Sequence, residues 1–213
     1  MFRLIVACTL LVALFEIQAI NGHGMMMDPV NRGSRWRVDA TAPTNWNDNE
    51  SYCGGIGIQF QVNGGKCGLC GDSFSAATPR PHELGGVYGG NGKIVKSYTS
   101  GAVIPVDIKM VANHQGHFNF DLCNLDQFLG ESESCFIANP VGVSNGDAKW
   151  KVPSGTGNFI INVKLPSGVR CKHCVLRWTY VSGNNWGTCE NGQGAMGCGP
   201  QETYKNCADI SIL

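Results

Sequence analysis

The cysteines of this chain constrain its fold more than any other feature. The chain has 213 residues and eleven cysteines, ten of which follow residue 50. Cysteine this abundant is typical of small proteins from oxidising compartments, where disulfides supplement the hydrophobic core. Ten is an even number, so we predict five disulfides, and the sequence leaves their pairing open. The ten residues are Cys53, Cys67, Cys70, Cys123, Cys135, Cys171, Cys174, Cys189, Cys198 and Cys207.

Zinc binding is the alternative use of these cysteines. Two residues separate Cys67 from Cys70, and two separate Cys171 from Cys174, which is a spacing that zinc ligands often have. The two pairs lie far apart in the sequence, and the start of the chain indicates export. We therefore expect disulfides rather than zinc.

Residues 1–22 have the composition of a secretory signal peptide. Arg3 supplies a positive charge, and the apolar run over residues 4–15 is too short to span a bilayer. Local rules allow cleavage after Ala19 or after Gly22, and the second cut makes His23 the first residue of the mature chain. No later stretch approaches about 20 apolar residues. We expect a secreted, extracellular protein without a membrane span or a lipid anchor.

Short apolar stretches with the period of a β-strand recur along the rest of the chain. In residues 104–112, Ile104, Val106 and Ile108 alternate with Asp107 and Lys109. Apolar stripes of helical period are nearly absent. The pattern predicts an all-β fold, an immunoglobulin-like or fibronectin III-like antiparallel β-sandwich with long disulfide-stapled loops over residues 24–92 and 183–206, in a single domain over residues 23–213. The predicted strands are residues 93–99, 104–112, 118–123, 158–165, 174–181 and 208–213.

Charge and motifs exclude several classes of protein. The chain has 16 basic and 16 acidic side chains, so it lacks the positive excess that neutralises phosphates, and we expect no nucleic-acid partner. The nucleophile motif Gly-x-Ser-x-Gly of many hydrolases is absent. Acidic residues are present, but nothing in the sequence pairs two of them as a glycosidase needs.

With these two kinds of catalytic site excluded, histidine is the remaining candidate for a catalytic or metal-binding residue. The chain has five histidines, and His114 lies in the short segment between the predicted strands 104–112 and 118–123. A tight turn between two strands holds an imidazole rigidly at the end of a sandwich. A single histidine in a turn is usually an ordinary surface residue. The combination of His114 with an N-terminal His23 indicates a functional site.

Eight motifs, in the same order along the chain, resemble those of one known family. They are HGMMMDP at 23–29, NDNE at 47–50 with CGG at 53–55, GGKCGLCGD at 64–72, PRPHE at 79–83, ANHQG at 112–116, CVLRWTY at 174–180, NWGTC at 185–189 and ETYKNCAD at 202–209. Together they cover essentially the whole mature chain. The chain resembles the lytic polysaccharide monooxygenases, specifically auxiliary activity family 15 in the chitin-binding type 4 domain group.

The resemblance implies a metal site and an activity. One copper ion per chain would be bound in a histidine brace, made by the α-amino nitrogen and side chain of His23 and the side chain of His114. Tyr204 matches the axial position, and Ala112 the small residue near the other axial face. Nitrogen-rich sites of this kind suit Cu(II). Cleavage after Gly22 is implied, because only that cut frees the amine.

The implied function is that of a secreted copper-dependent monooxygenase. It would use O2 or H2O2 and an external electron donor to cleave β-1,4-linked crystalline polysaccharide, with chitin as the first substrate and cellulose as the second, and it would act as a monomer. The alternatives are a non-catalytic chitin-binding extracellular protein on the same fold and a structural protein that uses copper or zinc for stability. Retention of His23, His114 and Tyr204 together favours the enzyme.

Further residues carry separate expectations. We expect His117 at the surface and outside the site, since neighbouring strand positions face opposite sides. Asn49 begins an Asn-Glu-Ser acceptor and is a glycosylation candidate. Aromatic residues in the long loops are candidates for stacking on sugar rings, although most such side chains are buried in proteins. These aromatics are Trp36, Trp46, Tyr52, Tyr88 and Trp186.

Overall fold

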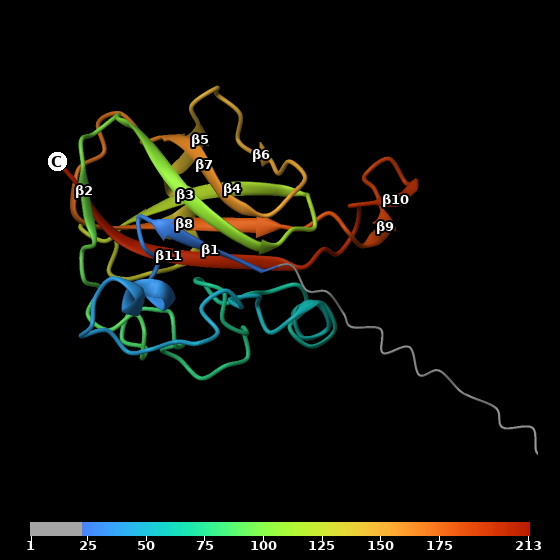
Figure 1. Cartoon of the computed structure of the whole chain (residues 1–213), viewed down its shortest axis with the longest axis horizontal. Helices are drawn as coiled ribbons and strands as arrows, with labels where there is room; N and C mark the ends of the chain where they lie inside the picture. Colours follow the sequence, from blue (N-terminus) through green and yellow to red (C-terminus); the bar gives the residue numbers. More distant parts are fainter. Residues whose placement is uncertain (1–22) are drawn as a thin grey trace, which may run out of the picture.

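A curled β-sheet forms the body of the molecule (Figure 1). The computed structural model describes residues 23–213, and the predicted signal peptide, residues 1–22, lies outside the described residues. The strands are β1 (His23–Asp28), β2 (Lys96–Tyr98), β3 (Val103–Ala112), β4 (His117–Asn124), β5 (Pro140–Val143), β6 (Trp150–Lys151), β7 (Gly157–Lys164), β8 (Cys171–Val181), β9 (Trp186–Thr188), β10 (Gly194–Met196) and β11 (Thr203–Ile212). The short helices are η1 (Arg32–Arg37), η2 (Ile58–Val62) and α1 (Glu133–Ala138).

The sheet order brings two layers face to face. Strands follow one another as β1-β3-β7-β5-β4-β8-β11-β2, with β6 paired to β4 and β9 paired to β10 as a separate hairpin. Alternate residues of β3 and β7 share one apolar core with residues of β4, β8 and β11. The predicted immunoglobulin-like sandwich is confirmed. One pair differs from the prediction, because β2 runs parallel to β11.

The burial pattern of the strands shows which layer is covered. In β3, buried and exposed residues alternate, so one face of this strand packs on the core and the other meets solvent. In β8 and β11 nearly every residue is buried. Both faces of these two strands are covered, because segments between β1 and β2 pack on the outer face of the layer (Figure 1).

The two regions predicted as long loops are mostly irregular and disulfide-linked, and they also contain short regular elements. Residues 24–28 belong to β1, and η1 and η2 follow. Residues 183–206 contain the β9–β10 hairpin and the start of β11. The three consecutive methionines of β1 lack the branched side chains that mark strands in a sequence. This segment is a strand because its backbone pairs with β3.

All ten cysteines after residue 50 form disulfides. The pairs are Cys53–Cys67, Cys70–Cys207, Cys123–Cys135, Cys171–Cys174 and Cys189–Cys198. Cys70–Cys207 ties the segment between β1 and β2 to β11, and Cys189–Cys198 closes the β9–β10 hairpin. Within residues 23–213, no group of three or more His, Cys, Asp or Glu residues is arranged to hold a metal ion, so the zinc interpretation finds no support.

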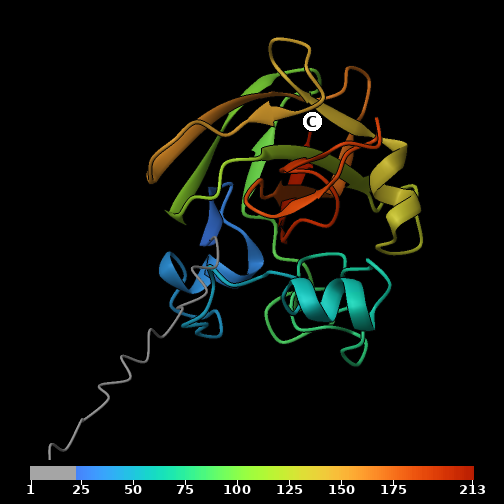
Figure 2. The ribbon, with the colours of Figure 1, turned by 90° about the vertical axis from the view of Figure 1, so that its right-hand side faces the viewer.

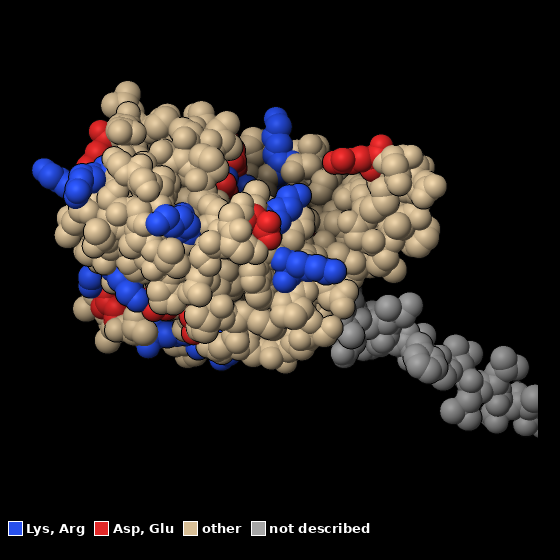
Figure 3. Space-filling view, turned by 90° about the horizontal axis from the view of Figure 1, so that it is seen from above, with Lys and Arg blue, Asp and Glu red and all other residues tan. Residues whose placement is uncertain are grey.

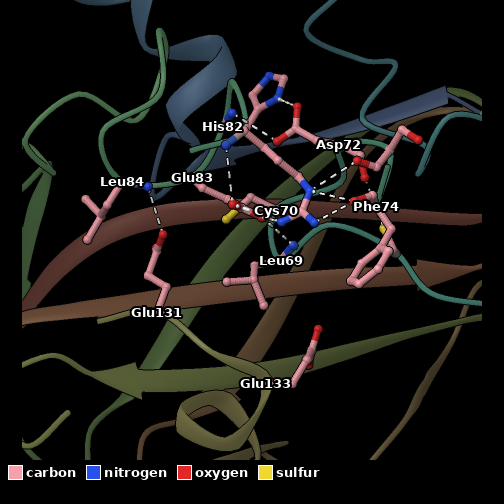
Figure 4. A network of polar contacts seen from close by, with 12 residues as sticks. Leu69, Cys70, Asp72, Phe74, His82, Glu83, Leu84, Glu131 and Glu133 are labelled. Atoms are coloured by element: carbon pink, nitrogen blue, oxygen red, sulfur yellow. Dashed lines mark hydrogen bonds and ion pairs between the residues drawn. The ribbon is translucent and has the colours of Figure 1, made fainter. Parts of the chain in front are cut away.

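A polar network also joins the covering segments to the sandwich. Arg32 of η1 binds both carboxylate oxygens of Asp209 in β11 at 2.7 Å and reaches Glu131 at 2.7 Å. Although burial opposes it, the hydrogen bonds from Arg32 and His173 hold the pKa of Asp209 below its usual value. Figure 4 shows the adjoining contacts, in which His82 meets Asp72 and the backbone N–H of Leu84 donates to Glu131.

Arg32→Met is expected to lower the free energy of unfolding by about 3–5 kcal/mol, because it leaves the buried Glu131 without its cation and leaves Asp209 with His173 alone. Denaturant titration with the disulfides intact measures the change. Lys93→Met is the matched control, since Lys93 pairs with Asp39 at the surface, where an ion pair contributes at most about 1 kcal/mol. A loss below about 1 kcal/mol in Arg32→Met would show that the cluster does not hold η1 on the sandwich.

The surface carries few charges. Figure 3 shows lysine, arginine and acidic side chains scattered over the face that it presents, among large uncharged areas. None of the helices in the described part of the chain has the length and apolar character needed to cross a bilayer.

Candidate metal centre

One end of the sandwich gathers the residues singled out in the sequence. β1 and β11 begin there, and β3 and β8 end there (Figure 1). Figure 2 looks at the molecule from this side, with the β9–β10 hairpin toward the viewer. His23 is the first residue of β1, Tyr204 is the second residue of β11, and His114 lies in the turn that follows β3. Residues far apart in the chain therefore meet at this end.

His23 is placed by the pairing of β1 with β3. It lies opposite Ala112, the last residue of β3. A Cβ atom at Gly24 would come within 2.6 Å of the sulfur of Met110, so glycine allows β1 to lie this close to the core. The side chain of His23 is 23% exposed, and its Nε2 atom lies 3.5 Å from Oε1 of Glu50. The imidazole thus sits at the surface beside a carboxylate.

His114 is held by the turn between β3 and β4. Its backbone N–H donates to the hydroxyl of Tyr180 at 2.9 Å, and its carbonyl accepts from the N–H of Gly183 at 3.0 Å. Gly116 has a φ of 83°, and a Cβ there would collide with the carbonyl oxygen of Val181. The turn therefore packs directly against the backbone that leaves β8. Nδ1 of the His114 ring lies 2.6 Å from the side-chain nitrogen of Asn184.

Tyr204 is the buried centre of an aromatic stack. Its ring lies 6.4 Å from that of His23, 5.6 Å from that of Tyr180 and 6.2 Å from that of Tyr52. Its hydroxyl donates to Glu202 at 2.8 Å. Burial, with the Glu202 charge as a further cause, raises the pKa of Tyr204 far above its ordinary value. Burial likewise raises the pKa of Tyr180 to about 12. Both phenols stay protonated at neutral pH.

The stack links the two histidines. His23 lies against Tyr204, Tyr204 stacks on Tyr180, and the hydroxyl of Tyr180 binds the backbone of His114. Each imidazole offers a nitrogen lone pair, and imidazole is the commonest metal ligand among protein side chains. Within residues 23–213 no group of three or more His, Cys, Asp or Glu residues is arranged around one metal position, so a metal bound by these two imidazoles would need an additional donor of another kind.

The other histidines have different surroundings. His117 begins β4, where it pairs with Lys151 and Val181. It is half-buried rather than fully at the surface, and burial, together with the charge of Lys149, lowers its pKa. His82 is bound to Asp72 at 2.8 Å, and His173 to Asp209 at 2.8 Å. These two contacts belong to the network that fastens the covering segments.

Three polar contacts at this end were not predicted from the sequence. Glu50 faces His23, Tyr180 binds the His114 backbone, and Asn184 meets the His114 ring. Glu50 belongs to the NDNE motif and Tyr180 to the CVLRWTY motif, but a motif does not show which residue each of its side chains contacts. Asn184 lies just before a motif and carried no signal of its own.

The loop aromatics divide into packed and exposed groups. Tyr52 stacks on Tyr204, and Tyr88 packs on His82 with ring centroids 4.8 Å apart. Trp46 is 79% exposed and makes an edge-on contact with Trp36. Trp186, in β9, is 71% exposed. Trp46 and Trp186 are therefore the two loop aromatics with a largely free ring. Asn49 is partly exposed.

The chain is similar to known proteins over most of its length. The family described as "Lytic polysaccharide mono-oxygenase, cellulose-degrading" matches residues 23–210. A solved lytic polysaccharide monooxygenase AA15 from Thermobia domestica, in the Cu(I) state, is 41% identical to this chain with a TM-score of 0.85, and the match covers 89% of this chain and 98% of that one.

A more distant structure shares the fold alone. The chitin binding domain from Burkholderia pseudomallei has a TM-score of 0.50 at 12% identity, over 91% of this chain and 100% of that one. No curated protein matches this chain significantly. The family match over residues 23–210 and the 41% identity to a solved relative confirm the resemblance seen in the sequence: the chain belongs to the lytic polysaccharide monooxygenases, in auxiliary activity family 15.

Proposed function

We propose that this chain is a secreted, monomeric copper-dependent monooxygenase that oxidatively cleaves crystalline chitin. The single observation that supports the proposal is a chain of contacts at one end of the sandwich: the His23 ring lies near that of the buried Tyr204, Tyr204 stacks on Tyr180, and the Tyr180 hydroxyl accepts from the backbone N–H of His114. The relative from Thermobia domestica, solved in the Cu(I) state, supports copper as the metal. We propose a single functional domain over residues 23–213.

The available donors fit copper. Two imidazoles supply two nitrogens, and the α-amino group of His23 supplies a third once the chain is cut after Gly22. That the family match begins at residue 23 supports this cut. Imidazole and amine nitrogens suit Cu(II), which heads the series of divalent metals for such ligands. An α-amino group has a pKa of about 7.7–8.0, so metal binding near neutral pH displaces its proton.

The residues around the donors have distinct tasks. His23 and His114 would hold the metal, and the buried ring of Tyr204 would pack beside His23. Ala112, which pairs with His23, would contribute only a small side chain next to that ligand. A bound copper ion supplies one-electron chemistry by which O2 or H2O2, with an external electron donor, oxidises C1 or C4 of a β-1,4-linked chain. Glu202 accepts the hydroxyl proton of Tyr204 in a hydrogen bond and so orients it.

The position of the site suits a solid substrate. His23 is partly exposed at the end of the sandwich. The β9–β10 hairpin lies at the same end (Figure 2), and Trp186 of β9 is 71% exposed. An apolar ring face that is free to solvent can lie on a pyranose ring. We propose that this end rests on the crystal surface, with cellulose as the second substrate.

Copper titration followed by product analysis tests the proposal. The mature protein is expected to bind one copper ion and, with ascorbate and O2, to release oxidised chitin oligosaccharides. Binding to chitin without oxidised products would instead indicate a non-catalytic chitin-binding protein. Copper binding with neither substrate binding nor products would indicate a structural metal. Parallel incubation with cellulose decides the preference between the two polysaccharides.

Tyr204→Phe is expected to keep copper affinity within a few-fold, to alter the electron paramagnetic resonance spectrum, and to slow product formation. The reason is that a phenol beside His23 would tune the metal more than it would hold it. The lost hydrogen bond leaves Glu202 without its donor and lowers the free energy of unfolding by about 1–3 kcal/mol. An unchanged spectrum in a folded variant would remove Tyr204 from the surroundings of the metal.

A further inference from the structure

The ring of His114 has one nitrogen already engaged. Nδ1 lies 2.6 Å from the side-chain nitrogen of Asn184, and the side-chain oxygen of Asn184 accepts from the hydroxyl of Ser182 at 3.0 Å. A metal cannot reach Nδ1 past this contact, so only Nε2 of His114 is free to bind one. The proton state of the ring therefore matters. Nε2 offers a lone pair only when Nδ1 carries the proton.

The two ends of an asparagine amide are nearly identical in shape. If the Asn184 amide turns by a half rotation, its oxygen faces Nδ1 and its nitrogen faces Ser182. Ser182 satisfies both orientations, because a hydroxyl can donate or accept. With the oxygen toward Nδ1, the ring donates from Nδ1 and leaves Nε2 unprotonated. With the nitrogen toward Nδ1, the ring is protonated on Nε2 and cannot bind a metal there.

The backbone that carries Asn184 is held in place from several sides. Gly183 donates to the carbonyl of His114, and Ser182, itself 2% exposed, donates its N–H to the carbonyl of Glu202. The buried side chain of Gln201 accepts from the N–H of Asn185 and donates to its carbonyl, both at 3.0 Å. The position of Asn184 relative to His114 is thus built into the fold. The side chain of Asn184 is exposed, and it contacts His114 and Ser182.

We infer that Asn184, backed by Ser182, is a positioning residue that accepts the Nδ1 proton of His114 and so keeps Nε2 available to the metal. The inference rests on the proposed function, in which His114 is a ligand. Hydrogen bonds to the second nitrogen of a ligating histidine commonly fix its tautomer and its orientation. Loss of such a partner typically weakens metal binding by about 10–100-fold.

Two substitutions at Asn184 test whether its side chain accepts a hydrogen bond from Nδ1 of His114 or donates one to it. Asn184→Leu has a similar size but no polar atom, and it is expected to weaken Cu(II) binding by about 10–100-fold. Asn184→Asp can only accept from the ring, so its Cu(II) affinity is expected to equal or exceed that of the wild type. Affinity is measured by competition between the mature protein and a copper chelator. Asn145→Leu is the matched control, because Asn145 makes a comparable side-chain contact with Asp147, lies outside the site, and is expected to leave affinity unchanged.

The tautomer itself is a second readout that needs no metal and no activity. Long-range 1H–15N correlation spectra of the metal-free protein, recorded where the imidazoles are neutral, report which ring nitrogen of His114 carries the proton. Asn184→Asp is expected to move the population to the Nδ1–H form, and Asn184→Leu to produce a mixture. If Asn184→Asp binds Cu(II) more weakly than the wild type, or holds the ring in the Nε2–H form, the amide donates and the inference is wrong.

The outcomes also distinguish this inference from the proposed function. If wild-type protein binds copper in a manner that depends on His114, while Asn184→Leu keeps both affinity and tautomer, only the role of Asn184 is overturned. If removal of His114 leaves copper binding intact, the proposed site itself fails. Should Asn184→Leu unfold, Asn184→Asp still decides, because it retains an acceptor and differs by one group.

Discussion

His114→Ala is expected to weaken copper binding by more than about 100-fold and to eliminate oxidised oligosaccharides. A neighbouring residue that merely orients a ligand costs about 10–100-fold when lost, so the ligand itself should cost more. The backbone bonds of residue 114 to Tyr180 and Gly183 do not involve the imidazole and persist in the variant. Its thermal unfolding in the metal-free state should therefore match that of the wild type. Chelator competition and mass spectrometry of the products measure the two effects.

His117→Ala is the matched control for that experiment. His117 is three residues further along, is also an imidazole, and begins β4 with its backbone paired to Lys151 and Val181. Its removal is expected to leave copper affinity within a few-fold of the wild type. If His117→Ala loses copper and His114→Ala keeps it, His117 rather than His114 is the ligand, and the metal site lies at the start of β4.

One extra residue ahead of His23 is expected to abolish both tight copper binding and activity. The addition converts the α-amino group into an amide, which is not basic and does not replace the third nitrogen. His23 stands at the start of β1, at the end of the sandwich, so a residue before it adds nothing to the core (Figure 1). The melting temperature of the metal-free protein should thus be nearly unchanged. A single Gly placed before His23 is the simplest variant.

N-terminal sequencing of the secreted protein is the companion measurement. The mature chain is expected to begin His23-Gly24. A mature chain that begins at Ile20 contradicts the site, because its amine then lies away from the two imidazoles. Full activity of the extended variant would contradict the site equally, and copper would have to be held by side chains alone.

The strands were largely predictable from the sequence because the evidence for a strand is local. The alternation in residues 104–112 appears as β3, and the predicted stretch 174–181 lies within β8. β1 was not predictable in this way. Its methionines give no alternating pattern, and it is a strand only because β3 lies beside it. The β9–β10 hairpin was not predicted either, because its strands are only three residues long and show no clear alternation.

The sequence by itself determined the class of fold, the family and the residues proposed to bind the metal, because strand periodicity and motifs are contained within a few neighbouring residues. Tertiary structure decided that Cys70 pairs with Cys207, that Arg32 binds Asp209, and that Asn184 contacts His114. Those partners are 137, 177 and 70 residues apart in the chain. Contacts across such separations depend on how the sheet curls and on which loops cover it, and no local pattern encodes either.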